Sequence, residues 1–187
     1  MYTKKIYFSG GDFHELQEVF CNLPGVTDTR TGYINAHGAA DFDSVADGSL
    51  RAYMGVEVVF NPKKMDLSKL MDVFFAVVNP YVPDGQGRAR GEMYRAGVFY
   101  ADAEDEPQIE LHVNFIASRG KPPAGNCLGL TMNDPNSDPR LTRQCFCLAQ
   151  PIESFQPAEP QHQHYFESHA RDDTCIDFAR LKACLKF

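Results

Sequence analysis

The sequence predicts a mixed α/β domain in which helices pack against a central sheet. Short runs rich in β-branched and aromatic residues alternate with segments whose apolar residues recur at helical spacing. The chain has 187 residues, which suits one domain, and no internal repeat or clear linker divides it. Hydrophobic residues make up 43% of the chain, which excludes a disordered acidic polypeptide. We therefore expect one domain over residues 1–187.

Strands and helices alternate in the first half of this predicted domain. Asp12 follows Gly10-Gly11 and is placed to be the N-cap of a helix, because its short carboxylate can accept the free N–H groups of the first turn. Strands are expected at residues 4–9, 26–35 and 53–60. Helices are expected at residues 13–23 and from Leu67 to before Pro80, and a loop is expected at residues 38–48.

The second half contains longer irregular segments. Residues 79–92 are rich in Gly, Pro and Arg and predict a long loop before a strand at residues 94–100. Residues 109–117 fit either a strand or a helix. We expect an irregular insertion at about 122–143, helices at 160–168 and 176–185, and a C-terminal tail at about 169–187.

Charge and composition narrow the classes of partner. The net charge of −7 argues against nucleic acid or an anionic membrane as a partner, and no apolar run approaches the roughly 18 residues of a membrane span. The start of the chain lacks the pattern of a signal peptide, so we expect a cytoplasmic protein with free thiols. We expect no cofactor and no metal, because His162 and His164 would diverge on a helix and no C-x-x-C pair is present.

Several motifs occur in a recognisable order: F-S-G-G-D-F-H, L-P-G-V-T-D-T-R-T-G-Y, G-V-E-V-V-F-N-P, D-G-Q-G, G-E-M-Y-R-A-G-V-F-Y and F-Q-P-A-E-P-Q-H-Q-H-Y. Their succession resembles the peptide methionine sulfoxide reductase A family over roughly residues 6–168. The resemblance implies a ferredoxin-like mixed sheet with flanking helices.

The resemblance also implies a change at the position of the family's nucleophile. The family's hallmark is Gly-Cys-Phe-Trp, and its Cys, Phe and Trp fall on Asp12, Phe13 and His14. A carboxylate cannot replace the thiolate, because the family's cycle passes through a sulfenic acid and then a disulfide.

Other family positions are partly kept. The resemblance places Glu57 at the family's proton donor, and Tyr33 and Tyr94 at the tyrosines that hydrogen-bond the substrate oxygen. Gln86 and Gly87 remain in the loop around the pocket, whereas Ala89 stands where the family has an aspartate. Phe13, His14, Gln86 and Gly87 are the expected substrate-binding residues.

Three functions follow from this pattern. In the first, the pocket performs non-redox acid–base chemistry on a small molecule, with Asp12 as base or cation anchor and Glu57 as acid. In the second, the chain is an inactive homologue that acts as a binding or regulatory module. In the third, it is a sulfoxide reductase that uses a displaced cysteine, such as Cys175 or Cys184.

Overall fold

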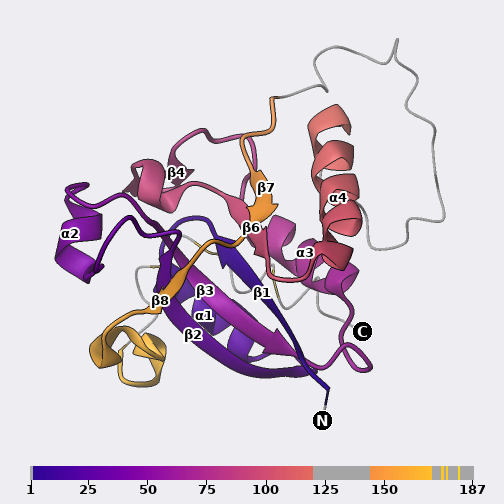
Figure 1. Ribbon diagram of the computed structural model, residues 1–187, viewed down its shortest axis with the longest axis horizontal. Coiled ribbons are helices and arrows are strands. Elements are labelled where there is room, and N and C mark those ends of the chain that lie inside the picture. Colours follow the sequence, from indigo (N-terminus) through magenta and orange to yellow (C-terminus); the bar gives the residue numbers. More distant parts are fainter. Residues whose placement is uncertain (1, 120–143, 170–173, 175, 177–180, 182–187) are drawn as a thin grey trace.

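A computed structural model describes residues 2–119, 144–169, 174, 176 and 181. In this part of the chain six strands form one mixed sheet, in the order β7-β6-β1-β3-β2-β8 (Figure 1). Their bounds are Lys4–Ser9 (β1), Val26–Ile34 (β2), Tyr53–Phe60 (β3), Gly97–Tyr100 (β6), Leu148–Pro151 (β7) and Phe155–Pro157 (β8). The hairpin of β4 (Gly85–Gln86) and β5 (Ala89–Arg90) stands apart from this sheet.

The described helices are α1 (Phe13–Cys21), α2 (Phe42–Ala46), α3 (Leu67–Val77) and α4 (Glu106–Arg119). Short 3-10 turns lie at Glu92–Tyr94, Ala103–Asp105, Pro160–His162 and Tyr165–Glu167. The succession β1-α1-β2-β3-α3-β6, with β6-β1-β3-β2 as neighbours in the sheet, is that of a ferredoxin-like core. β7 extends this core in parallel at one edge and β8 extends it antiparallel at the other.

One face of the sheet packs against helices. Figure 1 shows α1 and α3 behind the sheet, and α4 lies against α3. Phe8 is fully buried there, and its ring centroid lies 4.6 Å from that of Phe20 on α1 and 4.9 Å from that of Phe74 on α3. This face therefore holds the main hydrophobic core.

The side chains of successive strand residues point to opposite faces, and this alternation divides the sheet. Met54, Val56 and Val58 of β3 point toward the helices and are fully or almost fully buried there. Tyr53 and Glu57 point to the other face, where Tyr53 joins a smaller cluster with Tyr7, Ile34 and Phe99. The position of a residue along a strand thus decides which site it can reach.

Most of the expected elements of the first half are confirmed. Strands β1 and β3 have the expected bounds, α1 and α3 lie within the expected helices, and β2 ends at Ile34. The expected loop at residues 38–48 contains α2, because Asp41 and Ser44 form a reciprocal capping box at its start.

In the second half, the ambiguous segment 109–117 lies within a helix, α4. The strand expected at 94–100 begins only at Gly97, and the helix expected at 160–168 is two separate 3-10 turns. The insertion expected at 122–143 lies outside the described residues, as does most of the helix expected at 176–185 and of the tail from 169. Neither β7 nor β8 was expected.

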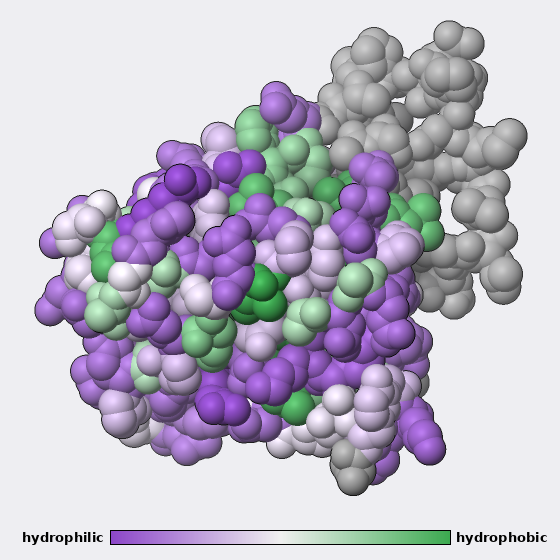
Figure 2. All heavy atoms as spheres, in the orientation of Figure 1, coloured by the Kyte–Doolittle hydropathy of each residue, from purple (hydrophilic) through white to green (hydrophobic). Residues whose placement is uncertain are grey.

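Hydrophilic residues cover most of the face shown in Figure 2, and hydrophobic residues appear there in small areas. Among the residues that the structure describes, no helix combines the length and the apolar character that crossing a bilayer requires.

Candidate functional site

A cavity of about 400 Å³ opens at the N-terminal end of α1. Asp12, His14 and Glu15 contribute to it from the start of the helix, and Phe42 contributes from α2. The segment that follows β8 closes the cavity with His162, Tyr165 and Phe166. The cavity therefore joins the beginning of the chain to a segment about 150 residues later.

Asp12 lies where the sequence predicts it, as the N-cap of α1. Its Oδ1 atom accepts the backbone N–H of His14 at 2.7 Å. The preceding Gly11 has a φ of +82°, which favours glycine, and a Cβ at Gly11 would lie 2.9 Å from Cβ of Gln86. The N–H of Gly11 donates to the carbonyl of Tyr94 at 2.9 Å. The glycine pair thus lets the helix begin directly against the 79–92 loop and the turn after it.

A chain of hydrogen bonds connects Asp12 to two imidazoles. Nδ1 of His14 lies 2.7 Å from Oδ1 of Asp12, and Nε2 of His14 lies 3.0 Å from Nδ1 of His162. The ring of His162 also stacks on Phe42, with centroids 4.4 Å apart and planes 19° apart. Both rings are therefore fixed, by hydrogen bonds on one side and aromatic contacts on the other.

Asp12 and His162, which stand at the two ends of this series of hydrogen bonds, both have pKa values below their ordinary values. Burial by itself raises the pKa of Asp12, but the hydrogen bonds and charge of His14 and the backbone N–H groups of His14 and Glu15 outweigh burial and lower it. Burial lowers the pKa of His162, and the charge of His14 lowers it further. At neutral pH an ionised Asp12 therefore stands at one end and a neutral His162 at the other.

Gln163 holds His162 in place. Its Oε1 accepts the N–H of Thr31 at 3.0 Å, and its Nε2 donates to the carbonyls of Thr31 and Ala158 at 2.9 and 3.0 Å. The hydroxyl of Thr31 donates to the carbonyl of His162 at 2.9 Å. The segment after β8 is thereby attached to β2, which places His162 over the start of α1.

Tyr33 has a partner that the sequence did not reveal. It is fully buried, and its hydroxyl donates to Oε2 of Glu159 at 2.6 Å. Oε1 of Glu159 accepts the N–H of Phe42 at 3.0 Å. Burial raises the pKa of Glu159 and these two hydrogen bonds lower it, with a net lowering. The P-A-E motif in the sequence contains Glu159. Its hydrogen bond with Tyr33 could not be predicted, because the two residues are far apart in the sequence.

The other expected site residues, unlike Asp12 and His14, do not line this cavity. Phe13 is fully buried and packs edge-on against His14, with ring centroids 4.7 Å apart. Tyr94 packs on the same cluster, and its pKa is raised by burial and by the charge of Asp12. Gln86 exchanges two hydrogen bonds with the backbone of Asn79, at 2.7 and 2.8 Å, so it holds the loop together. Gly87 has a φ of +52° in the turn of the β4–β5 hairpin.

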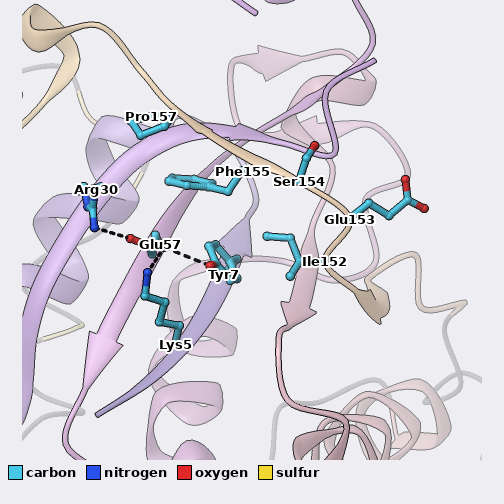
Figure 3. A pocket seen from close by; sticks show the side chains of 9 residues that line it. All are labelled: Lys5, Tyr7, Arg30, Glu57, Ile152, Glu153, Ser154, Phe155 and Pro157. Carbon is cyan, nitrogen blue, oxygen red and sulfur yellow. Dashed lines mark hydrogen bonds and ion pairs between the residues drawn. The ribbon is translucent and has the colours of Figure 1, made fainter. Parts of the chain in front are cut away.

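Glu57 does not join Asp12, contrary to expectation. Its carboxylate lies on the opposite face of the sheet, where Lys5 and Arg30 form ion pairs with it and Tyr7 donates a hydrogen bond at 3.0 Å (Figure 3). Because strand side chains alternate, a residue three positions from Met54 points to the other face.

Met54 occupies the place expected of Glu57. It pairs with Tyr33 across β2 and β3 and packs in one cluster with Tyr33 and Phe13. A thioether is no proton donor. The face of β3 that lies near Tyr33 therefore brings no carboxyl group to the site.

The described cysteines lie away from the cavity. Cys21 is the last residue of α1, at the end opposite Asp12. Cys145 and Cys147 lie just before β7, and burial raises the pKa of both thiols. A raised pKa disfavours the thiolate that a nucleophile needs. Cys127, Cys175 and Cys184 lie outside the described residues.

The lowered pKa of His162 leads to a prediction about stability. As the pH falls below about 6.5, the unfolded chain takes up a proton at this imidazole before the folded protein does. The free energy of unfolding should therefore decrease with falling pH in that range. The variant His162→Gln should show a smaller decrease, measured by urea unfolding at several pH values between 7 and 5. Equal slopes in both proteins would contradict a lowered pKa of His162.

Comparisons with known proteins agree with the fold and with the motifs. The model of the family described as peptide methionine sulfoxide reductase matches residues 4–124. The peptide methionine sulfoxide reductase MsrA 2 of Rhodopirellula baltica is 28% identical over 177 residues, which cover 92% of this chain and 90% of that protein. MsrA of Mycoplasma pneumoniae is 36% identical over 118 residues, or 60% of this chain and 75% of that protein.

Solved structures show the same fold. The reduced form of Mxr1 from Saccharomyces cerevisiae superposes with a TM-score of 0.75 and 21% identity, over 92% of this chain and 89% of that one. Methionine sulfoxide reductase A of Corynebacterium diphtheriae gives a TM-score of 0.68 and 20% identity, over 94% and 83% of the two chains.

The sheet with its added edge strands thus defines an α/β protein of the methionine sulfoxide reductase A type. Since the family model matches well over half of the chain, the chain belongs to the peptide methionine sulfoxide reductase family, which is a family of enzymes.

Proposed function

We propose that this protein uses the cavity at Asp12 for non-redox proton transfer on a small polar molecule. The observation that carries this proposal is the hydrogen-bonded chain from Asp12 through His14 to His162. It replaces the pairing of Asp12 with Glu57 that the sequence suggested, because Glu57 points to the other face.

The hydrogen bonds give each ring nitrogen a role. Ionised Asp12 can only accept, so Nδ1 of His14 carries a proton. When His14 is neutral its Nε2 has a lone pair, and Nδ1 of His162 must then be the donor. Nε2 of His162 is left with its lone pair as the basic atom of the chain. The charges of Glu159 and Asp12 favour a proton there and partly offset the effects of burial and of the charge of His14.

Hydrolysis of p-nitrophenyl acetate is a simple measure of the free lone pair on His162, since an accessible imidazole displaces p-nitrophenolate and water then hydrolyses the acetylimidazole. We expect the protein to accelerate the hydrolysis, and His162→Gln to slow it about a hundredfold, the lower range of the effects typical of a catalytic imidazole. Asp12→Asn should slow it less and shift its pH profile. His37→Gln is the matched control, because His37 is exposed on another segment. An unchanged rate in His162→Gln would refute the proposed base.

A second candidate is reduction of peptide methionine sulfoxide by a cysteine elsewhere in the chain. The names of the relatives favour it, since the matches given above are called peptide methionine sulfoxide reductases. This candidate is weakened because it needs a reactive thiol at the site of attack. Asp12 occupies the start of α1, and the thiols of Cys145 and Cys147 have raised pKa values.

A reductase assay separates the two candidates. In this reaction a sulfoxide and two thiols of dithiothreitol give a thioether, a disulfide and water. Turnover of a methionine sulfoxide peptide that is lost in Cys175→Ala or Cys21→Ala would establish the second candidate and overturn the first. Neither activity, together with a ligand bound in the cavity, would instead support an inactive homologue that acts as a binding module.

A further inference from the structure

A second cavity lies on the face of the sheet that turns away from α1. It has a volume of about 410 Å³ and is framed by β1, β2, β3 and the segment that contains β8. Figure 3 shows Arg30 at one end, Phe155 above the strands, and Glu57 between Arg30 and Tyr7, with Lys5 below it. None of the residues that line it lines the cavity at Asp12.

Glu57 lies at the floor of this second cavity. Its side chain is only 4% exposed, and its Oε2 receives Nζ of Lys5 at 3.1 Å and the hydroxyl of Tyr7 at 3.0 Å. Nη2 of Arg30 lies 3.2 Å from Oε1, but Oε1 accepts no hydrogen bond from the described part of the chain. A buried carboxylate oxygen without a donor is costly unless something supplies one.

Lys5 and Arg30 still have N–H donors that could bind a ligand. The side chains of Lys5 and Arg30 are each 47% exposed, and each offers more N–H donors than its contact with Glu57 uses. Asp28 also pairs with Arg30, 3.6 Å from its Nε, but both side chains are about half exposed, so water screens this pair. The carboxylate of Glu153 points away at the other end of the cavity (Figure 3).

Phe155 and Pro157 give the cavity an apolar wall. Both come from the β8 segment, and the ring of Phe155 lies 5.2 Å from that of Tyr7. An arginine beside an aromatic wall suits a planar carboxylate with an apolar remainder, because guanidinium binds carboxylate through two parallel hydrogen bonds.

We propose that this cavity is a binding site for a small organic carboxylate that carries a hydroxyl or amino donor next to its carboxylate. The carboxylate binds between Arg30 and Lys5, the donor reaches Oε1 of Glu57, and the apolar part lies against Phe155. The site is separate from the proposed proton-transfer site, so either proposal can fail without the other.

Three related probes test the carboxylate and the donor contact separately by NMR titration of the full chain. Mandelate has the carboxylate, the hydroxyl and a ring; phenylacetate lacks the hydroxyl; mandelamide lacks the charge. We expect mandelate to shift the amide signals of residues 154–157, phenylacetate to bind about threefold to tenfold more weakly, and mandelamide not to bind. Equal binding of mandelate and mandelamide, or no binding of mandelate, would overturn the proposal.

Variants of the two cations locate the binding. Arg30→Gln and Lys5→Gln should each weaken mandelate binding about tenfold, whereas Arg51→Gln should leave it unchanged, since Arg51 is exposed and outside the cavity. Thermal unfolding shows whether each variant is folded. One folded variant, Arg30→Gln or Lys5→Gln, is enough for the test. Unchanged affinity in a folded Arg30→Gln or Lys5→Gln would refute this placement of the carboxylate.

Discussion

Replacing Lys5 and Arg30 together by methionine is expected to lower the free energy of unfolding by about 3 kcal/mol. The change leaves the carboxylate of Glu57 buried, with only Tyr7 as a hydrogen-bond donor. Removing the partners of a buried charge costs roughly 3–5 kcal/mol. The lower end of that range applies because both cations are half exposed and the donor on Tyr7 remains. Urea unfolding at neutral pH measures the difference.

A third substitution shows whether the loss of stability in the double variant comes from the buried charge of Glu57 or from lost packing. Adding Glu57→Met to the double variant removes the isolated charge and keeps an apolar side chain of similar length. We expect most of the lost stability to return, since well-packed apolar residues often replace a buried ion pair without loss. If the triple variant is no more stable than the double variant, the cost lies in the packing of the long Lys5 and Arg30 side chains.

The sequence pattern did not determine to which face of the sheet the side chain of Glu57 points. The run from Tyr53 to Phe60 predicts a strand with the observed bounds, and a strand requires alternation of its side chains. Matching Glu57 to a family motif ignored that alternation, because it placed Glu57 on the same face as Tyr33. In the structure Met54 pairs with Tyr33 and Arg30 pairs with Glu57. The register between β2 and β3 therefore decides which residue of β3 lies near Tyr33.

Local features of the site were predictable, whereas its long-range contacts were not. Asp12 as an N-cap follows from its neighbours, because the glycine pair ends a strand and an apolar helical pattern begins. The contact between His14 and His162 joins residues 148 positions apart. It depends on β8, a three-residue strand that is too short to leave a periodic signal.

These findings place the candidate site at the meeting of two segments. The start of α1 provides Asp12 and His14 on a rigid helix that packs in the main core. The segment after β8 provides His162, and in the described residues it contains only short 3-10 turns. The geometry of the proposed base therefore depends on the hydrogen bonds that attach this segment to β2.

Gln163→Ala is accordingly expected to disturb the site more than its position outside the cavity suggests. The change removes the acceptor of the Thr31 N–H and the amide donor to the Ala158 carbonyl, whereas the Thr31 carbonyl keeps the N–H of Ala158 as a donor. We expect a loss of about 2 kcal/mol in the free energy of unfolding, in line with unpaired, partly buried polar groups. Chemical denaturation measures this loss.

The same variant should change the titration of His162 before it changes the fold. When the segment is released, His162 loses its burial and its contact with His14, which are the two main causes of its lowered pKa. Its pKa should therefore rise toward the ordinary value, which an NMR titration of the imidazole signals detects. Gln156→Ala is the matched control, because Gln156 on β8 binds Ala40 and Gly38 but not the segment of His162. If both variants shift His162 equally, then β8 as a whole, and not the amide of Gln163, positions the imidazole.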